Sequence, residues 1–194
     1  MAECIAFNPK VEVIGGTVNA FVNSMNRGKE KRLAILEKHG ITPKEEEWYS
    51  QQNWLNAFKE VADSVGEMNL FLIGVAIIEN AQFPPINNLE EGLSVIDVAY
   101  HMSHRLDGQV LFNPETGEKG EGIGNYTLVE FNEKERMATM VCKNPYPSKF
   151  DEGIITAICR KYQPADSEKV IVKVDIEKER RTKGGESCTY IINW

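Results

Sequence analysis

The chain has 194 residues, of which 42% are hydrophobic and 26% charged, a composition that predicts one globular domain over residues 1–194 with a single core. Its net charge is −7 and its sequence pI is near 5.1, with acids interleaved in every Lys/Arg cluster, which argues against a nucleic-acid or anionic-membrane surface. The N-terminus lacks a signal-peptide pattern and no apolar run approaches the roughly 18 residues of a membrane span, so we expect a cytoplasmic protein.

Four cysteines, Cys4, Cys142, Cys159 and Cys188, are spread widely along the chain, with no C-x-x-C motif and no histidine at zinc-finger spacing. We therefore expect free thiols and no disulfide framework. Cys159 lies on the apolar stripe of a predicted helix, where a thiol packs as a small hydrophobic residue. Cys142 and Cys188 fall in predicted strands and can face either the core or a cavity, which makes Cys142 a candidate ligand contact.

The N-terminal third of the chain predicts a short strand and then helices. Thr17 after two glycines is a typical helix start, and apolar residues continue at helical spacing as far as Leu36. Thr42-Pro43 followed by acidic residues is a second start signal. The expected elements are a strand at 10–14, a helix from 17 to the glycine at 40, a helix beginning at 42–46, and a break at Gly66 or Asn69.

Residues 70–81 are nearly all apolar and predict a buried helix, since they are too few to span a bilayer. Gly74 lies inside this segment, where glycine costs a helix about 1 kcal/mol relative to alanine. Such a glycine indicates that another backbone or a ligand approaches closely, so Gly74 is a candidate ligand contact.

The next predicted helix begins at Asn88 and ends in the segment Tyr100-His101-Met102-Ser103-His104. Two histidines three residues apart lie on adjacent parts of one helix face and can meet a single ligand. The alternative is a pair of partly exposed polar residues that complement the helix dipole. His104 and Tyr100 are therefore candidate ligand contacts, and His101 and His104 are candidate metal ligands.

The C-terminal half predicts an antiparallel sheet with one helix inserted. After a turn-rich connection at 106–124, the expected elements are strands at 125–131 and 136–142, a Pro-rich turn at 144–147, a helix to Tyr162, and strands at 169–175 and 187–194. The fold class is α+β: N-terminal helices, within residues 15–105, pack on a sheet of about four strands within residues 124–194.

The passage NPYPSKFDEGIITAICRKY, with the later GGESCTYIINW, resembles the end of 4-vinyl-reductase-type small-molecule-binding domains. It also resembles their superfamily, which includes heme nitric-oxide/oxygen-binding domains and trafficking subunits that hold an acyl chain. Cys142 and Cys188 match cysteines of the family, whereas Ser148 and Arg180 stand where it often has cysteine. Two remaining thiols cannot make a closed metal site.

In the heme-binding branch, the resemblance implies an iron-ligating histidine on the helix before the sheet and a Tyr-x-Ser-x-Arg motif that holds the heme propionates. His101 and His104 lie on the corresponding helix, and Tyr146 and Ser148 match the motif. Phe150 replaces its arginine and removes the planar donor that pairs with a carboxylate. Heme is therefore a candidate cofactor that the local residues do not favour.

These observations lead to three hypotheses. The first is a non-catalytic sensory module that binds a small hydrophobic molecule in an interior pocket, with Gly74, Tyr100, His104, Tyr146 and Cys142 as contacts. The second is a heme-dependent gas sensor with His101 or His104 as axial ligand. The third is a scaffold or partner-binding domain.

The chain contains no nucleophile elbow, phosphate loop or paired carboxylates, so an enzyme is not expected. A sensor without an output domain would pass its signal to a separate partner chain. We also expect a homodimer, built on Phe21 and Met25 of the first helix.

Overall fold

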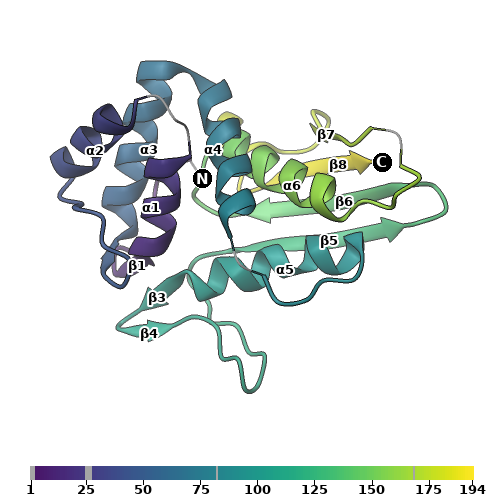
Figure 1. Ribbon diagram of the computed structural model, residues 1–194, viewed down its shortest axis with the longest axis horizontal. Coiled ribbons are helices and arrows are strands. Elements are labelled where there is room, and N and C mark those ends of the chain that lie inside the picture. The colour runs from purple at the N-terminus through teal and green to yellow at the C-terminus, as the bar shows by residue number, and fades with distance from the viewer. Residues whose placement is uncertain (1–2, 25–27, 82, 168) are drawn as a thin grey trace.

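The computed structural model describes residues 3–24, 28–81, 83–167 and 169–194 (Figure 1). Its helices are α1 (Gly15–Asn23), α2 (Lys29–Lys38), α3 (Gln51–Val65), α4 (Glu67–Asn80), α5 (Leu89–Met102), α6 (Ser148–Tyr162) and the 3-10 turn η1 (Arg181–Lys183). Its strands are β1 (Val11–Ile14), β2 (Trp48–Ser50), β3 (His104–Leu106), β4 (Gln109–Val110), β5 (Asn125–Asn132), β6 (Met137–Lys143), β7 (Ile171–Val174) and β8 (Cys188–Asn193). Within these residues, no helix combines the length and apolar character needed to cross a bilayer.

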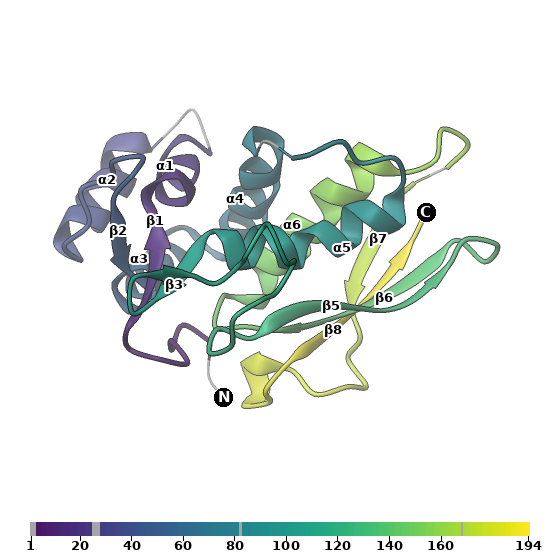
Figure 2. The same cartoon turned by 90° about the horizontal axis from the view of Figure 1, so that it is seen from below.

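The C-terminal sheet has the strand order β5-β6-β8-β7, with antiparallel pairing throughout. Alternate residues of β6 are buried, and they pair with buried residues of β8, as Met140 does with Tyr190. Figure 2 shows α5 and α6 on one side of this sheet. The α+β prediction is confirmed, with α6 as the helix inserted between β6 and β7.

A second antiparallel sheet, with the order β2-β1-β3-β4, lies near the N-terminal helices (Figure 1). The strand predicted at 10–14 is its β1, but the sheet itself was not predicted. The pairing is nonlocal, since Val11 pairs with Leu106, and each strand has no more than four residues. Val11 and Val13 are fully buried and connect this sheet to the core.

Two predicted helix boundaries in the N-terminal third are wrong. The helix expected from 17 to 40 is two helices, because α1 ends at Asn23 and α2 begins only after Gly28, which adopts a positive φ of 77°. Residues 42–46 form no helix. The Gly15 N–H donates to the Glu47 carbonyl at 2.7 Å and the Tyr49 hydroxyl donates to the Thr42 carbonyl at 2.5 Å, which holds this loop in a turn. Helix α3 starts later, at Gln51.

One of the two residues predicted to form a homodimer surface on the first helix does not lie at the surface. Phe21 is fully buried and packs edge-on against Trp54, with ring centroids 4.8 Å apart. Its neighbour in that prediction, Met25, lies outside the described residues.

A buried ion pair joins the inserted helix to the segment before the last strand. The Arg181 guanidinium donates to the Asp151 carboxylate, and both side chains are almost completely shielded from solvent. The Tyr126 hydroxyl donates to the same carboxylate at 2.6 Å, and the Asn144 amide donates to it at 3.2 Å. Burial raises the pKa of the Asp151 carboxyl, while Arg181 and these two donors counter that shift by stabilising the carboxylate.

Helices α4 and α6 cross at a pair of glycines. A Cβ on Gly74 would lie 2.3 Å from the Phe150 carbonyl oxygen, and one on Gly153 would lie 2.2 Å from the Phe71 carbonyl oxygen. Both distances are shorter than any real Cβ contact, so the two backbones meet only because neither residue has a side chain. The sequence offered two explanations for Gly74, the close approach of another backbone or of a ligand. The structure shows the close approach of the α6 backbone.

Replacing Gly153 with alanine should lower the free energy of unfolding by about 1–3 kcal/mol, because the new methyl group forces α4 and α6 apart. Urea denaturation of the variant and the parent protein measures this loss. Gly16→Ala is the matched control, since a Cβ there meets only the flexible end of the Glu45 side chain, and it should leave stability unchanged or increased. Equal stability of both variants would contradict the tight crossing.

Candidate functional site

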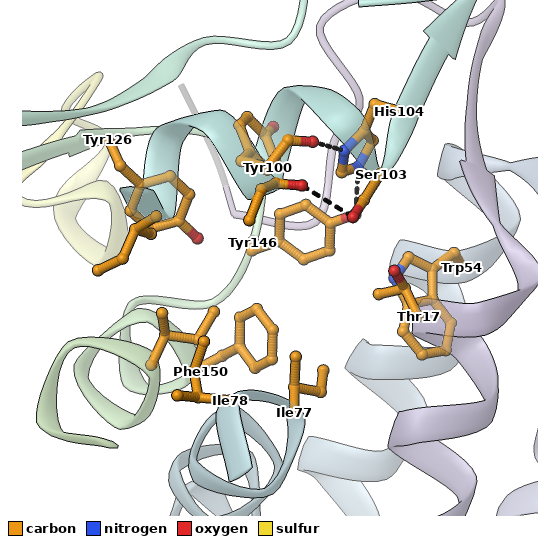
Figure 3. A pocket seen from close by; sticks show the side chains of 13 residues that line it. Thr17, Trp54, Ile77, Ile78, Tyr100, Ser103, His104, Tyr126, Tyr146 and Phe150 are labelled. Carbon is orange, nitrogen blue, oxygen red and sulfur yellow. Dashed lines mark hydrogen bonds between the residues drawn. The ribbon is translucent and has the colours of Figure 1, made fainter. Parts of the chain in front are cut away.

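A cavity of about 80 Å³ lies where α1, α3 and α4 meet α5, β5 and the start of α6 (Figure 3). Its walls are mainly aromatic and aliphatic. They comprise Thr17, Trp54, Ile77, Ile78, Ile96, Ala99, Tyr100, Ser103, His104, Tyr126, Tyr146, Phe150 and Ile154. The cavity therefore collects side chains from segments far apart in the sequence.

The Pro-rich turn before α6 fixes Tyr146 in this wall. The Tyr146 N–H donates to the Asn144 side-chain oxygen at 2.9 Å, and Pro147 precedes the first residue of α6. The Phe150 N–H then donates to the Pro147 carbonyl at 2.9 Å, which starts the helix. Proline restricts its own φ and the backbone of the residue before it, so the turn holds Tyr146 in one place.

His104 and Tyr146 form a buried pair at the polar end of the cavity, as Figure 3 shows. The His104 Nδ1 lies 2.7 Å from the Tyr100 carbonyl oxygen, which can only accept, so we assign the ring proton to Nδ1. The Tyr146 hydroxyl lies 2.8 Å from Nε2 and donates to its lone pair. Burial lowers the pKa of His104 to about 4, so the imidazole is neutral at pH 7.

The tyrosines around the cavity are protonated hydroxyls at pH 7. Burial raises the pKa of Tyr100, Tyr126 and Tyr146 well above the ordinary range. The Tyr100 hydroxyl donates to the Ile123 carbonyl at 2.7 Å, and that of Tyr126 donates to Asp151. Each of these three hydroxyl protons therefore has a partner within the protein.

The sequence-predicted site residues divide into two groups. Tyr100, His104 and Tyr146 come together in the cavity wall. Gly74 lies in the α4–α6 crossing and is not part of the wall, and Cys142 is fully buried in β6 opposite Cys188. Burial raises the pKa of the Cys142 thiol well above its usual value, so this side chain is a neutral core group.

The two histidines do not share a helix face. Helix α5 ends at Met102, and His104 is the first residue of β3, so only His101 is helical. Both rings are buried, which contradicts the partly exposed alternative. The His101 Nδ1 lies 2.7 Å from the Asp97 carbonyl oxygen, and His101 does not line the cavity. Over the described parts of the chain, no group of three potential ligands could hold a metal ion.

Two further residues near Tyr146 were not predicted from the sequence. Gln51 and Trp54 lie on α3 and are completely buried. Three residues separate them, so they share a helix face. The signal in the sequence was a polar glutamine at helical spacing from the apolar residues Trp54, Leu55 and Phe58.

The residues that the resemblance relates to heme propionates have partners within this protein. The Tyr146 hydroxyl donates to His104, and the Ser148 N–H donates to the Glu3 carboxylate at 2.8 Å. Phe150, in place of the arginine, lines the cavity. A cavity of about 80 Å³ is also far too small for a porphyrin. These side chains, as arranged, do not fit a heme group, and the Nε2 of His104, which an axial ligand would use, accepts the Tyr146 hydroxyl.

No family model and no curated protein matches the chain. Solved structures match it at low identity but over nearly its full length. A single-substitution variant of Tt H-NOX is 15% identical, with a TM-score of 0.61 and coverage of 93% of this chain and 94% of the other. A double-substitution variant of Tt H-NOX is 12% identical, with a TM-score of 0.62 and the same coverage.

An oxygen-binding H-NOX domain related to soluble guanylate cyclases, in its oxygen complex, is 15% identical with a TM-score of 0.56, and the match covers 92% of this chain and 93% of that one. The architecture is therefore that of an α+β fold shared with these solved structures. Its fold is the H-NOX (heme NO/oxygen-binding) fold. This fold agrees with the H-NOX part of the sequence resemblance, whereas the 4-vinyl-reductase part is not shown.

Lowering the pH should destabilise the protein through His104. Its pKa is about 4 in the folded protein and 6.5 for the ordinary side chain. Between pH 4 and 6.5 the unfolded chain therefore binds more protons at this residue than the folded protein does. Stability is lost as the pH falls through this window, by up to about 3 kcal/mol. Urea denaturation of the protein and of His104→Gln at pH 7.5 and 4.5 isolates this contribution. An identical pH dependence in both proteins would show that His104 does not titrate on unfolding.

Proposed function

We propose that this chain is a non-catalytic sensor domain that binds a small ligand in the cavity beside His104 and Tyr146. The observation that carries the proposal is an apolar cavity with one polar end, in which a neutral imidazole is oriented by the Tyr100 carbonyl. Apolar pockets with a few converging polar groups are the usual binding sites for small molecules, and this one has that character at a smaller volume. The H-NOX fold supports it, since its solved neighbours include a domain described as oxygen-binding.

Filling the cavity should abolish ligand binding while the fold persists. Ala99 lines the cavity from α5, and a leucine there would occupy the space of a ligand. A compound that binds only the folded protein stabilises it by about 2.7 kcal/mol at a concentration of one hundred times its Kd. We expect some small apolar compound to raise the Tm of the parent protein and to leave that of Ala99→Leu unchanged.

Ala34→Leu, on the exposed side of α2, is the matched control and should retain the ligand-induced rise in Tm. If no compound raises the Tm of the parent protein, and it does not take up hemin either, the cavity is only a packing gap. The scaffold or partner-binding alternative would then be the remaining function.

Heme binding is the second candidate, and the comparisons favour it over a generic ligand. The description of one structural neighbour concerns heme redox potential and porphyrin distortion. The descriptions of two others mention heme distortion in the H-NOX family and an oxygen-binding H-NOX domain. In this chain the Nδ1–H of His104 is held by a carbonyl, which is the usual arrangement for a metal-ligating imidazole, and Tyr146 would have to release Nε2 for an iron to bind there. The small cavity and the internal partners of Tyr146 and Ser148 speak against it.

A hemin titration separates the two candidates. If heme binds, the protein should take up one equivalent and show a Soret band that His104→Ala abolishes, because His104 is the histidine that reaches the cavity. His101→Ala is the matched control and should keep the band, since His101 does not line the cavity. A band lost with His101 would contradict this assignment, and the absence of any uptake would remove the heme candidate.

A further inference from the structure

Two hydrogen-bond donors beside the cavity have no acceptor. The Trp54 side chain lines the cavity and is completely buried, and its indole N–H makes no hydrogen bond. The Gln51 side chain, one turn earlier on α3, is equally buried, and neither its amide nitrogen nor its oxygen has a partner. Buried polar groups in native proteins nearly always have partners, so each exception requires an explanation.

Both donors lie next to the Tyr146 hydroxyl. Burial raises the pKa of Tyr146, and Gln51 and Trp54 partly counter that shift, as donors near a phenol oxygen do. Neither forms a hydrogen bond of acceptable geometry with that oxygen. The Tyr146 proton itself points to His104 Nε2. The indole N–H of Trp54 is therefore a buried donor in the cavity wall without an acceptor of good geometry.

We propose that the ligand is a small uncharged molecule with a hydrogen-bond-accepting oxygen, such as a carbonyl, which the Trp54 indole N–H holds beside Tyr146. The apolar remainder of the ligand lies against Ile77, Ile78 and Phe150. Figure 3 shows these residues on the side of the cavity opposite His104. This inference rests on the proposed function and specifies its ligand.

The charges and the size of the cavity support this class of ligand. Its described lining contains no Lys, Arg, Asp or Glu, and His104 is neutral, so neither an anion nor a cation would find a counter-charge there. The volume of about 80 Å³ is roughly half that of the 150 Å³ protein cavity that admits benzene. A molecule of a few heavy atoms, or one end of a larger one, fills it.

The test compares acetone with isobutene, which has the same shape but a methylene group in place of the carbonyl oxygen. In nitrogen-15 NMR spectra, acetone should shift the indole N–H signal of Trp54 downfield and isobutene should not. The indole signals of Trp48 and Trp194, which do not line the cavity, are internal references. An unchanged Trp54 signal at saturating acetone would overturn the proposal without any substitution.

The variant Trp54→Phe removes the donor and keeps an aromatic ring. The ratio of acetone to isobutene affinity should fall about tenfold in this variant, the effect of losing one hydrogen bond. Trp48→Phe, the same change in β2, should keep the ratio of the parent protein. An equal ratio in Trp54→Phe would overturn the ligand class while the proposed binding site stands. If neither compound nor xenon enters the cavity, both the ligand class and the proposed function fail.

Discussion

The ion pair between Asp151 and Arg181 is the interaction on which the rest of the structure depends. Two charges are costly to remove from water, and removing one partner of a buried pair commonly costs 3–5 kcal/mol. Here the pair joins α6 to η1, and the same carboxylate accepts bonds from Tyr126 of β5 and Asn144 of the Pro-rich turn. Because Asn144 also holds the Tyr146 backbone, this cluster of charges sets the position of the cavity wall.

The chain has the H-NOX fold, and the side chains that the sequence resemblance relates to heme have partners within this protein. Polar groups that the resemblance relates to heme carboxylates are used within the protein: Tyr146 bonds to His104, and Ser148 bonds to the Glu3 carboxylate. A fold fixes where a pocket forms, and its side chains determine what the pocket accepts. Aromatic rings fill most of the space here, so the architecture encloses a volume suited to a much smaller molecule.

Local sequence patterns predicted an element correctly where its own residues stabilise it. The Asn88 cap and the apolar stripe of the helix at 148–162 appeared in the structure as predicted. The N-terminal sheet could not be predicted, because three- and four-residue strands gain their stability from partners about ninety positions away. The sequence analysis selected Tyr100, His104 and Tyr146, which share one cavity wall. Their contacts, and the unpaired donors of Gln51 and Trp54, arise only from tertiary packing.

The position of β8 has a consequence for how the domain folds during synthesis. In the order β5-β6-β8-β7, β8 is an interior strand although it is made after all the others. Until residues 188–193 leave the ribosome, β6 presents an unpaired edge and β7 has no neighbour. Such a nascent chain exposes the template on which strands of other molecules can add. The domain is therefore most open to misassembly in the interval before β8 is made.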